Sequence, residues 1–175
     1  IPSNKVEDIE DIEDNEGIDD GITFVTGAKD ESWKTIIKQE KSYCKGSNLF
    51  ISHKGNGNKR PIKYYEGECN YSNLMSLCLL KNEYISKIYI KYIYYYLLSI
   101  KQDIEYNYQR GSCNQVLDIK NFNRMKIPIP SLEIQNNIIQ LNIKTEKQIE
   151  KKKKEIEILQ DKANKELKTI LISFK

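Results

Sequence analysis

The last quarter of the chain constrains the fold most, because residues 131–175 contain neither proline nor glycine. Pro128 and Pro130 force an extended segment just before this stretch, and Ser131 then stands where a helix N-cap is expected. We predict a helix from Ser131 to Lys175, about 43 residues and ~65 Å long. Apolar residues follow steps of three and four along one face of this helix: Ile149, Ile156, Leu159, Ala163, Leu167, Ile170 and Phe174.

A helix of this length cannot be covered by a body of about 110 residues, so its apolar stripe needs a second helix, from the same chain or from a partner. Lys152 and Glu166 interrupt the heptad pattern, which predicts a short or irregular coiled coil. We expect the seven stripe residues to form a surface for a homodimer or for partner docking. The alternative is an amphipathic helix that packs on its own domain.

Residues 21–130 have the pattern of one compact domain. Short β-rich runs over 22–26, 48–52 and 62–65 predict strands, and turn signals containing glycine follow each of them. The longer apolar run over 83–105 favours a helix, since strands rarely reach twenty residues. The predicted fold class is therefore α+β, with one mixed α/β globular domain followed by the long helix.

The charge of the chain is distributed unevenly. Residues 1–20 form an acidic lead-in or linker without aromatic residues. Residues 1–31 hold 11 Asp and Glu against 2 Lys, whereas the rest of the chain holds 26 Lys and Arg against 14 Asp and Glu. A basic body behind an acidic start favours a polyanionic partner, although lysines on a solvated helix face explain the same excess.

The sequence lacks the patterns that most enzyme classes need. No Walker loop, GxGxxG, HExxH or Asp-Pro-Pro-Tyr-type methyltransferase motif occurs. His53 is the only histidine, and the glycines and asparagines near it do not preorganise a catalytic base. We predict that the chain is not an enzyme, has no catalytic residues and needs no cofactor.

The cysteines do not indicate a metal site either. Cys44, Cys69, Cys78 and Cys113 show no CxxC spacing, so we expect neither structural zinc nor a disulfide framework. Free thiols indicate a reducing compartment that contains DNA, such as the cytoplasm. No run of 18 apolar residues occurs, and we predict no membrane span.

Two loop segments combine cations, amides and glycines in a way that suits DNA. The first runs from Ser52 to Arg60 and the second from Tyr106 to Gln115. Lys and Arg neutralise phosphates, and Asn, Gln and Arg can read adenine and guanine in the major groove. Ordinary solvated loops are the alternative. The candidate DNA-binding residues are Lys54, Asn56, Asn58, Lys59, Arg60, Tyr108, Arg110, Asn114 and Gln115.

The end of the predicted domain carries a closing motif. Its residues are Gly111 to Asp118, Asn121-Phe122, and Met125-Lys126-Ile127-Pro128-Ile129-Pro130-Ser131-Leu132-Glu133-Ile134-Gln135. This motif resembles the end of the target-recognition domains of type I restriction-modification specificity subunits, which typically close with an isoleucine-proline-leucine-proline pattern, then leucine and glutamine, and enter a long helix. Gly21 to Gly27 and Leu49 to Gly55 are similar to earlier strands of the family and stand in the right order.

The resemblance covers about residues 21–174 and implies a domain that reads one half, ~3–4 base pairs, of a bipartite site in double-stranded DNA. It implies that the helix pairs with a second helix and docks a methyltransferase (modification) subunit, which carries catalysis and S-adenosylmethionine. The recognition loops of the family vary, so no base-reading residue is carried over by position.

A complete specificity subunit has two such domains and two helices, whereas this chain has one of each. A half-size subunit that homodimerises, a fragment, and the recognition domain of a single-chain type IIG enzyme with a fused methyltransferase domain all fit. Ile1 in place of methionine and the acidic start favour a fragment or a fused domain. Two other classes stay open: a coiled-coil structural or interaction protein whose basic surface is incidental, and a divergent nuclease or transferase.

Overall fold

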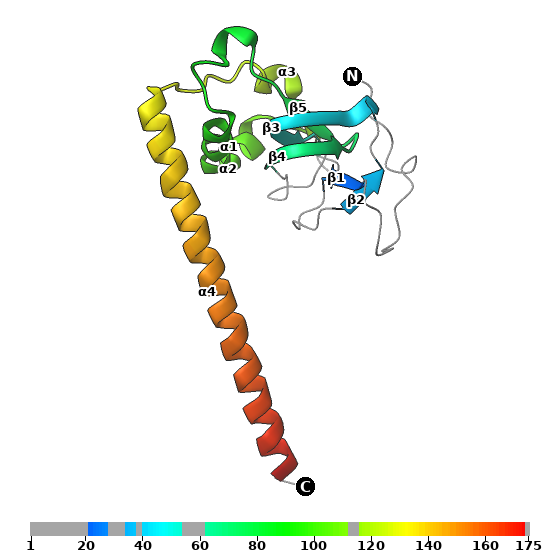
Figure 1. Ribbon diagram of the computed structural model, residues 1–175, viewed down its shortest axis with the longest axis vertical. Helices are drawn as coiled ribbons and strands as arrows, with labels where there is room; N and C mark the ends of the chain where they lie inside the picture. Colours follow the sequence, from blue (N-terminus) through cyan, green and yellow to red (C-terminus); the bar gives the residue numbers. More distant parts are fainter. Residues whose placement is uncertain (1–20, 28–33, 38–39, 54–61, 112–115, 174–175) are drawn as a thin grey trace. The chain divides into compact units, whose positions relative to one another are not determined.

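The computed structural model of the protein describes residues 21–27, 34–37, 40–53, 62–111 and 116–173. The chain divides into two compact units, Ile1–Gln135 and Asn136–Lys175. The first contains a five-stranded sheet with short helices, and the second consists of the continuation of one long helix (Figure 1). The fold is thus the predicted mixed α/β domain followed by a long helix.

The sheet has the strand order β2-β1-β4-β3-β5. Its centre is the antiparallel pair of β3 (Tyr43–Ser52) and β4 (Ile62–Tyr71). β1 (Gly21–Val25) runs parallel to β4 and pairs antiparallel with β2 (Lys34–Ile37), which forms one edge. β5 (Met75–Cys78) pairs antiparallel with β3 and forms the other edge. The sheet is therefore mixed, with one parallel pair.

Three of the five strands coincide with the runs that the sequence predicts over 22–26, 48–52 and 62–65. β3 and β4 are longer than predicted, because ladder pairing carries both strands through polar residues. The sequence does not predict β2, whose extended conformation comes with its pairing to β1. Both differences arise from partners that are distant in sequence.

The β3–β4 pair bends sharply. Ser52, the last residue of β3, pairs with Met75. Tyr71 directly follows Asn70, which pairs with Tyr43 at the start of β3. A straight ten-residue strand would place these levels ~30 Å apart. The chain from Tyr71 to Met75 spans at most ~15 Å. The two strands must therefore bend, so that the two ends of each strand come closer together than in a straight strand.

The bend is located at Gly46 and Gly67, which face each other across the two strands. Their φ angles are 91° and 136°, values that residues with a Cβ atom rarely adopt. A Cβ added at Gly67 would also lie 3.3 Å from the ring of Tyr65. Glycine at both positions lets the strands change direction while they stay paired.

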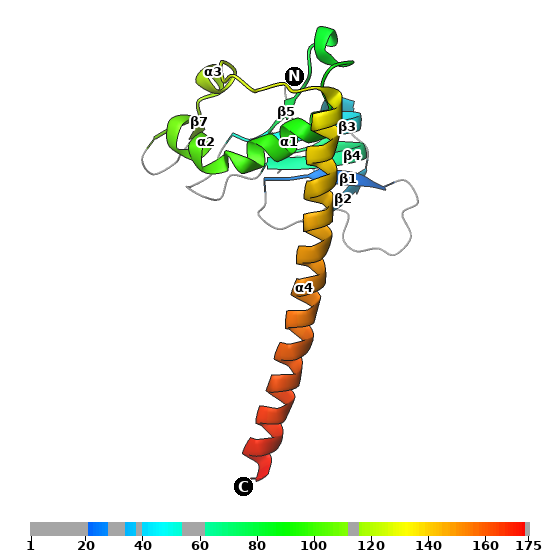
Figure 2. The same cartoon turned by 90° about the vertical axis from the view of Figure 1, so that its left-hand side faces the viewer.

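The inner side of the curled sheet encloses a core cluster of Val25, Phe50, Cys69, Tyr71 and Met75. Helix α1 (Ile90–Ser99) packs against β3 and β4 with its own buried face, as Figure 2 shows. That face is made of Tyr92, Ile93, Tyr95 and Leu97. Burying large apolar side chains contributes about 1.5–3 kcal/mol each, so this cluster and this helix face both stabilise the fold.

The single helix predicted over 83–105 is wrong in its extent. The structure has a 3₁₀ turn at Asn82–Tyr84, then α1, and then a separate helix α2 (Lys101–Asn107) after a break at Ile100. Tyr89 is extended, with φ −80° and ψ 121°, so α1 cannot begin before residue 90. The apolar spacing indicated a helix correctly, but contacts elsewhere in the fold set where it starts.

The second predicted loop is also more ordered at its start than the sequence indicates. Residues 106 and 107 belong to α2, and β6 (Gln109–Arg110) pairs with β7 (Val116–Leu117) in a two-stranded sheet. Gly111, with φ 94°, follows β6 directly. A short helix α3 (Ile119–Phe122) comes after β7, and the proline-containing stretch up to Ser131 has no regular secondary structure.

Helix α4 (Leu132–Ser173) is 42 residues long, as the absence of proline and glycine predicts. Ser131 caps it, because its Oγ accepts a hydrogen bond from the Ile134 N–H at 3.4 Å. No helix within the described ranges is long and apolar enough to span a membrane. The predicted stripe is exposed along α4, and Phe174 lies outside the described residues; relative exposure is 50% for Ile149, 53% for Ile156, 65% for Leu159, 55% for Leu167 and 53% for Ile170.

The first turn of α4 is attached to the sheet-bearing unit by Gln135, whose side chain is fully buried. Its Oε1 accepts a hydrogen bond from the Tyr89 N–H at 3.0 Å. Its Nε2 donates to the carbonyl oxygens of Lys87 at 3.0 Å and Pro130 at 2.8 Å. One amide thus satisfies the backbone at the start of α1 and the extended segment before α4.

Replacing Gln135 by alanine should destabilise the protein by at least ~2 kcal/mol, because backbone groups at Lys87, Tyr89 and Pro130 would no longer have their hydrogen-bond partner. Urea unfolding followed by circular dichroism measures the change. Gln148→Ala is the matched control, since Gln148 is an exposed glutamine of α4 and its replacement should change stability by less than about 0.5 kcal/mol. Equal effects of the two substitutions would contradict the anchoring role.

Candidate nucleic-acid interface

The two predicted DNA-binding segments are anchored at neighbouring points. The first segment continues from His53, the residue after β3, and the second ends where β7 begins. The Leu117 N–H of β7 donates to the carbonyl oxygen of His53 at 2.9 Å. The start of one candidate segment and the end of the other are therefore held together, although they are more than fifty residues apart in sequence.

His53 also forms hydrogen bonds with the chain at and just before β5. Its N–H donates to the carbonyl oxygen of Leu74 at 3.0 Å, and Ser52 Oγ donates to the same oxygen at 3.3 Å. His53 Nδ1 lies 3.3 Å from Ser76 Oγ. These contacts give His53 a structural position between β5 and β7, and it supports the chain at the start of the first segment.

A third segment of the chain comes close to Ser52 and Leu74. A Cβ added at Gly27, which follows β1, would lie 3.5 Å from Ser52 Oγ and 3.7 Å from Leu74 Cβ. Gly27, Ser52, His53 and Leu117 thus gather at one place, which we call the rim. The candidate segments of the sequence analysis both connect to this rim.

Of the nine predicted DNA-binding residues, only two are described by the structure, and both take part in internal contacts. Arg110 Nη2 lies 2.5 Å from Asp118 Oδ2, and the Tyr108 ring packs edge-on against Phe122 with ring centroids 6.0 Å apart. The remaining seven lie outside the described residues: Lys54, Asn56, Asn58, Lys59, Arg60, Asn114 and Gln115.

Asp118 is the centre of the contacts around Arg110. It is 8% exposed, and its carboxylate accepts from the backbone N–H of Asn121 at 3.3 Å and from Asn121 Nδ2 at 2.6 Å. It therefore caps α3 as well as pairing with Arg110. The Arg110 side chain remains 69% exposed, and a guanidinium has five N–H donors, so this pairing leaves donors that a phosphate or base can reach.

The structure indicates three further candidate DNA-binding cations that the sequence pattern did not single out. Lys120, Arg124 and Lys126 follow β7 directly, are exposed, and have no ion-pair partner among the residues that the structure describes. They alternate with the half-buried residues Phe122 and Met125. That alternation was the available signal, because it places the cations on the outer side of a segment whose apolar residues turn inward.

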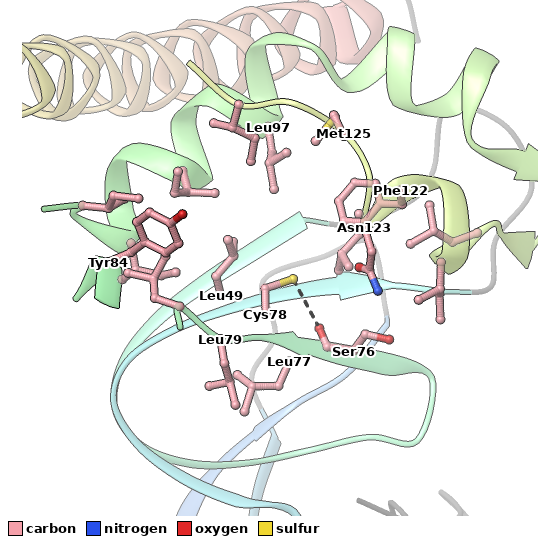
Figure 3. Close-up of a pocket in the computed structure, with 18 of the residues that line it drawn as sticks. Leu49, Ser76, Leu77, Cys78, Leu79, Tyr84, Leu97, Phe122, Asn123 and Met125 are labelled. Carbon is pink, nitrogen blue, oxygen red and sulfur yellow. Dashed lines mark hydrogen bonds between the residues drawn. The ribbon is translucent and has the colours of Figure 1, made fainter. Parts of the chain in front are cut away.

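An apolar pocket of about 680 Å³ lies on the same unit, between β5, α1 and the segment around α3. Figure 3 shows Leu49, Leu77, Leu97, Phe122 and Met125 around it. Its lining contains no carboxylate, histidine, lysine or arginine. Within the described ranges, no group of three His, Cys, Asp or Glu is placed to hold a metal ion. The polar side chains in the pocket lining are those of Ser76, Cys78, Tyr84 and Asn123, and the rest of the described lining is apolar.

Asp118→Ala should lower the free energy of unfolding by about 1–2 kcal/mol, because α3 would have no cap and Asn121 no acceptor. Arg110→Ala is the control, and we expect a smaller change, below about 1 kcal/mol, because the Arg110 side chain is 69% exposed and Asp118 keeps its hydrogen bonds from Asn121. Urea unfolding of both variants measures the difference. A larger destabilisation by Arg110→Ala would mean that the ion pair, and not the cap, holds this region.

The chain matches a known protein family over most of its length. A model of the type I restriction modification DNA specificity domain matches residues 9–160. The match begins within the acidic segment, includes the whole sheet and α1 to α3, and extends along more than half of α4. No curated protein sequence matches the chain. The resemblance inferred from the closing motif is confirmed, and the chain belongs to the family of type I restriction-modification DNA specificity domains.

Proposed function

We propose that this specificity domain reads one half of a bipartite DNA site with the segments that connect to the rim. As a member of this non-catalytic family, the chain recognises DNA sequence for a restriction-modification system. The observation that carries the finer proposal is the hydrogen bond between His53 and Leu117. It holds the residue before the first segment's cations beside the strand that follows the second segment, and we infer that the Lys, Arg, Asn and Gln residues of both segments follow one stretch of a groove.

Within this proposal the residues divide by chemistry. Lys54, Lys59 and Arg60 neutralise phosphates, and Lys120, Arg124 and Lys126 extend the positive surface beyond β7. Base edges are read by the amides and by the planar guanidinium: Asn56, Asn58, Asn114, Gln115 and Arg110. Tyr108, whose ring contacts Phe122, is the aromatic residue of the second segment in this proposal.

We further propose that α4 docks a methyltransferase, as a separate modification subunit or as a fused domain. The exposed stripe on α4 supports a helical partner, because isolated exposed leucine and isoleucine are common whereas a continuous row on one helix face is not. A second copy of this chain is the alternative occupant of the same stripe. Catalysis belongs to the methyltransferase in either arrangement.

Replacing Lys54, Lys59 and Arg60 together by alanine should weaken binding to cognate DNA. It should also reduce the slope of log affinity against log salt by roughly one for each phosphate that is no longer neutralised. Fluorescence anisotropy at several salt concentrations measures both quantities. Replacing Lys120, Arg124 and Lys126 should lower the slope in the same way.

The matched control removes three exposed lysines of α4, Lys147, Lys151 and Lys153, which changes the net charge equally. If this control flattens the slope as much as the first variant, net charge and not the rim explains DNA binding. Unchanged slopes in all three variants would remove both groups of cations from the interface. No DNA affinity in the wild-type chain would favour a purely structural coiled-coil protein.

Replacing Ile156 and Ile170 by aspartate should weaken co-purification with the methyltransferase, or self-association if a second copy is the partner. Analytical ultracentrifugation of the chain alone, and then with the modification subunit, separates these two outcomes. DNA binding by the isolated chain and the far-ultraviolet signal should change little, since both side chains are exposed.

The control for this experiment lies on the same helix. Ile158 and Ile172 are 68% and 72% exposed but lie about half a turn away from the stripe. Ile158→Asp with Ile172→Asp makes the same chemical change on the opposite face and should leave partner binding intact. If both double variants weaken binding equally, the stripe has no special role.

A further inference from the structure

Two cysteines outside the proposed DNA surface face each other across the central strands. Cys44 of β3 is the direct partner of Cys69 in β4, and their sulfur atoms lie 3.3 Å apart. Cys44 Sγ is also 3.6 Å from the carbonyl oxygen of Cys69. Both are free thiols in the structure. Nothing in the proposed recognition of DNA uses this pair.

The backbone already has the spacing that a disulfide needs. Facing residues of antiparallel strands have Cα atoms ~4.5–5.5 Å apart, inside the range of about 4.4–6.8 Å for disulfides. The sulfurs would have to approach by ~1.3 Å, which rotation about the side-chain bonds supplies. Cross-strand closure therefore requires no change of register.

Neighbouring contacts hold the register of β3 and β4 at the Cys44–Cys69 pair. The next pair along the strands, Lys45 and Glu68, forms an ion pair of 2.8 Å. The pair after it is Gly46 and Gly67, where the strands bend. On the inner side, Cys69 is fully buried in the core cluster and Cys44 packs against that cluster. The two sulfurs are thus kept together by contacts that do not depend on the thiols themselves.

The two thiols differ in reactivity. Cys44 is half-buried and can meet a small oxidant, whereas Cys69 is enclosed. The hydrogen bond from Cys69 lowers the pKa of the Cys44 thiol, and the same hydrogen bond raises the pKa of Cys69. Burial raises the pKa of the Cys78 thiol to about 11, so Cys78, like Cys69, is a poor first nucleophile toward a peroxide. Cys44 is accordingly the first thiol to react, with Cys69 next to it.

We propose that Cys44 and Cys69 form a reversible cross-strand disulfide when the protein meets a peroxide. The Cys44 thiolate attacks one peroxide oxygen, the O–O bond breaks, and a sulfenic acid forms with release of water. The Cys69 thiol then attacks the Cys44 sulfur, the S–S bond forms, and a second water leaves. Two S–H bonds are replaced by one S–S bond while hydrogen peroxide is reduced to two waters, and a dithiol such as dithiothreitol reverses the step.

The consequence concerns the segment that the strands carry. The disulfide closes a ring from residue 44 to residue 69, and this ring contains the first candidate DNA-binding segment with Lys54, Lys59 and Arg60. Oxidation would thus covalently link the start of β3 to the end of β4, the two strands of the hairpin that leads to the rim. Because a cross-link restricts the unfolded chain, the oxidised protein should melt about 5 °C or more above the reduced protein.

The test uses the full chain, freed of reductant and treated with a small molar excess of hydrogen peroxide. Residual thiols are then alkylated and the protein is digested with trypsin. Cys44 falls in the peptide 42–45, but Cys69 and Cys78 share the peptide 64–81. The Cys78→Ser background therefore makes the link assignable by mass spectrometry. We expect a linked pair of these peptides, two hydrogens lighter than their sum, that separates on reduction.

Wild-type protein provides a second route that depends on no substitution. Chymotrypsin cleaves after Tyr71 and Leu77, which separates Cys69 from Cys78. In the variants, Cys69→Ser should leave a Cys44 sulfenic acid that dimedone traps, and Cys44→Ser should leave both products absent. The melting temperature should rise on oxidation only when both thiols are present.

Other products would overturn the proposal. A sulfenic or higher acid on Cys44 of the wild-type chain without a link would show that Cys69 does not resolve it. A link from Cys44 to Cys113, or between two chains, would show that a different thiol is the partner. Equal oxidation of Cys78 and Cys44 would remove the basis for selectivity.

Discussion

The bend in the β3–β4 pair is the constraint on which the sheet-bearing unit depends. Two facing glycines with positive φ, Gly46 and Gly67, allow both strands to turn without breaking their ladder. Because of this turn, the chain after β4 returns to the end of β3 within three residues. The core cluster, the edge strand β5 and the rim all follow from that return.

The rim joins segments of the chain that are distant in sequence. Two of its contacts are backbone hydrogen bonds, from Leu117 to His53 and from His53 to Leu74, and these two do not depend on the side chains of the segments they anchor. In the proposed mode of recognition, the DNA-reading segments can therefore change in sequence while their attachment stays the same. Gln135 plays a comparable part elsewhere, because one buried amide secures the first turn of α4 to α1.

Prediction from the sequence succeeded where the signal was local. The proline pair, the capping Ser131 and the uninterrupted stretch after it identified α4 almost to its ends. The closing motif identified the family, which the match over residues 9–160 confirms. Prediction was less successful for 83–105, because the hydrogen bond between Tyr89 and Gln135 decides where α1 begins. Arg110 stays a predicted DNA contact, and its pairing with Asp118 is not indicated by any local spacing.

The sequence by itself determined the long amphipathic helix, three of the strands and the class: a mixed α/β domain with a basic body and a specificity-domain motif. These are properties of neighbouring residues, and helical periodicity, caps and composition express them directly. Only the tertiary structure decided that His53 meets Leu117, that Cys44 faces Cys69, and that Asp118 holds Arg110. Cys44 faces Cys69 because of the register between β3 and β4, and Arg110 meets Asp118 after β6 pairs with β7. No local pattern encodes a register between distant strands.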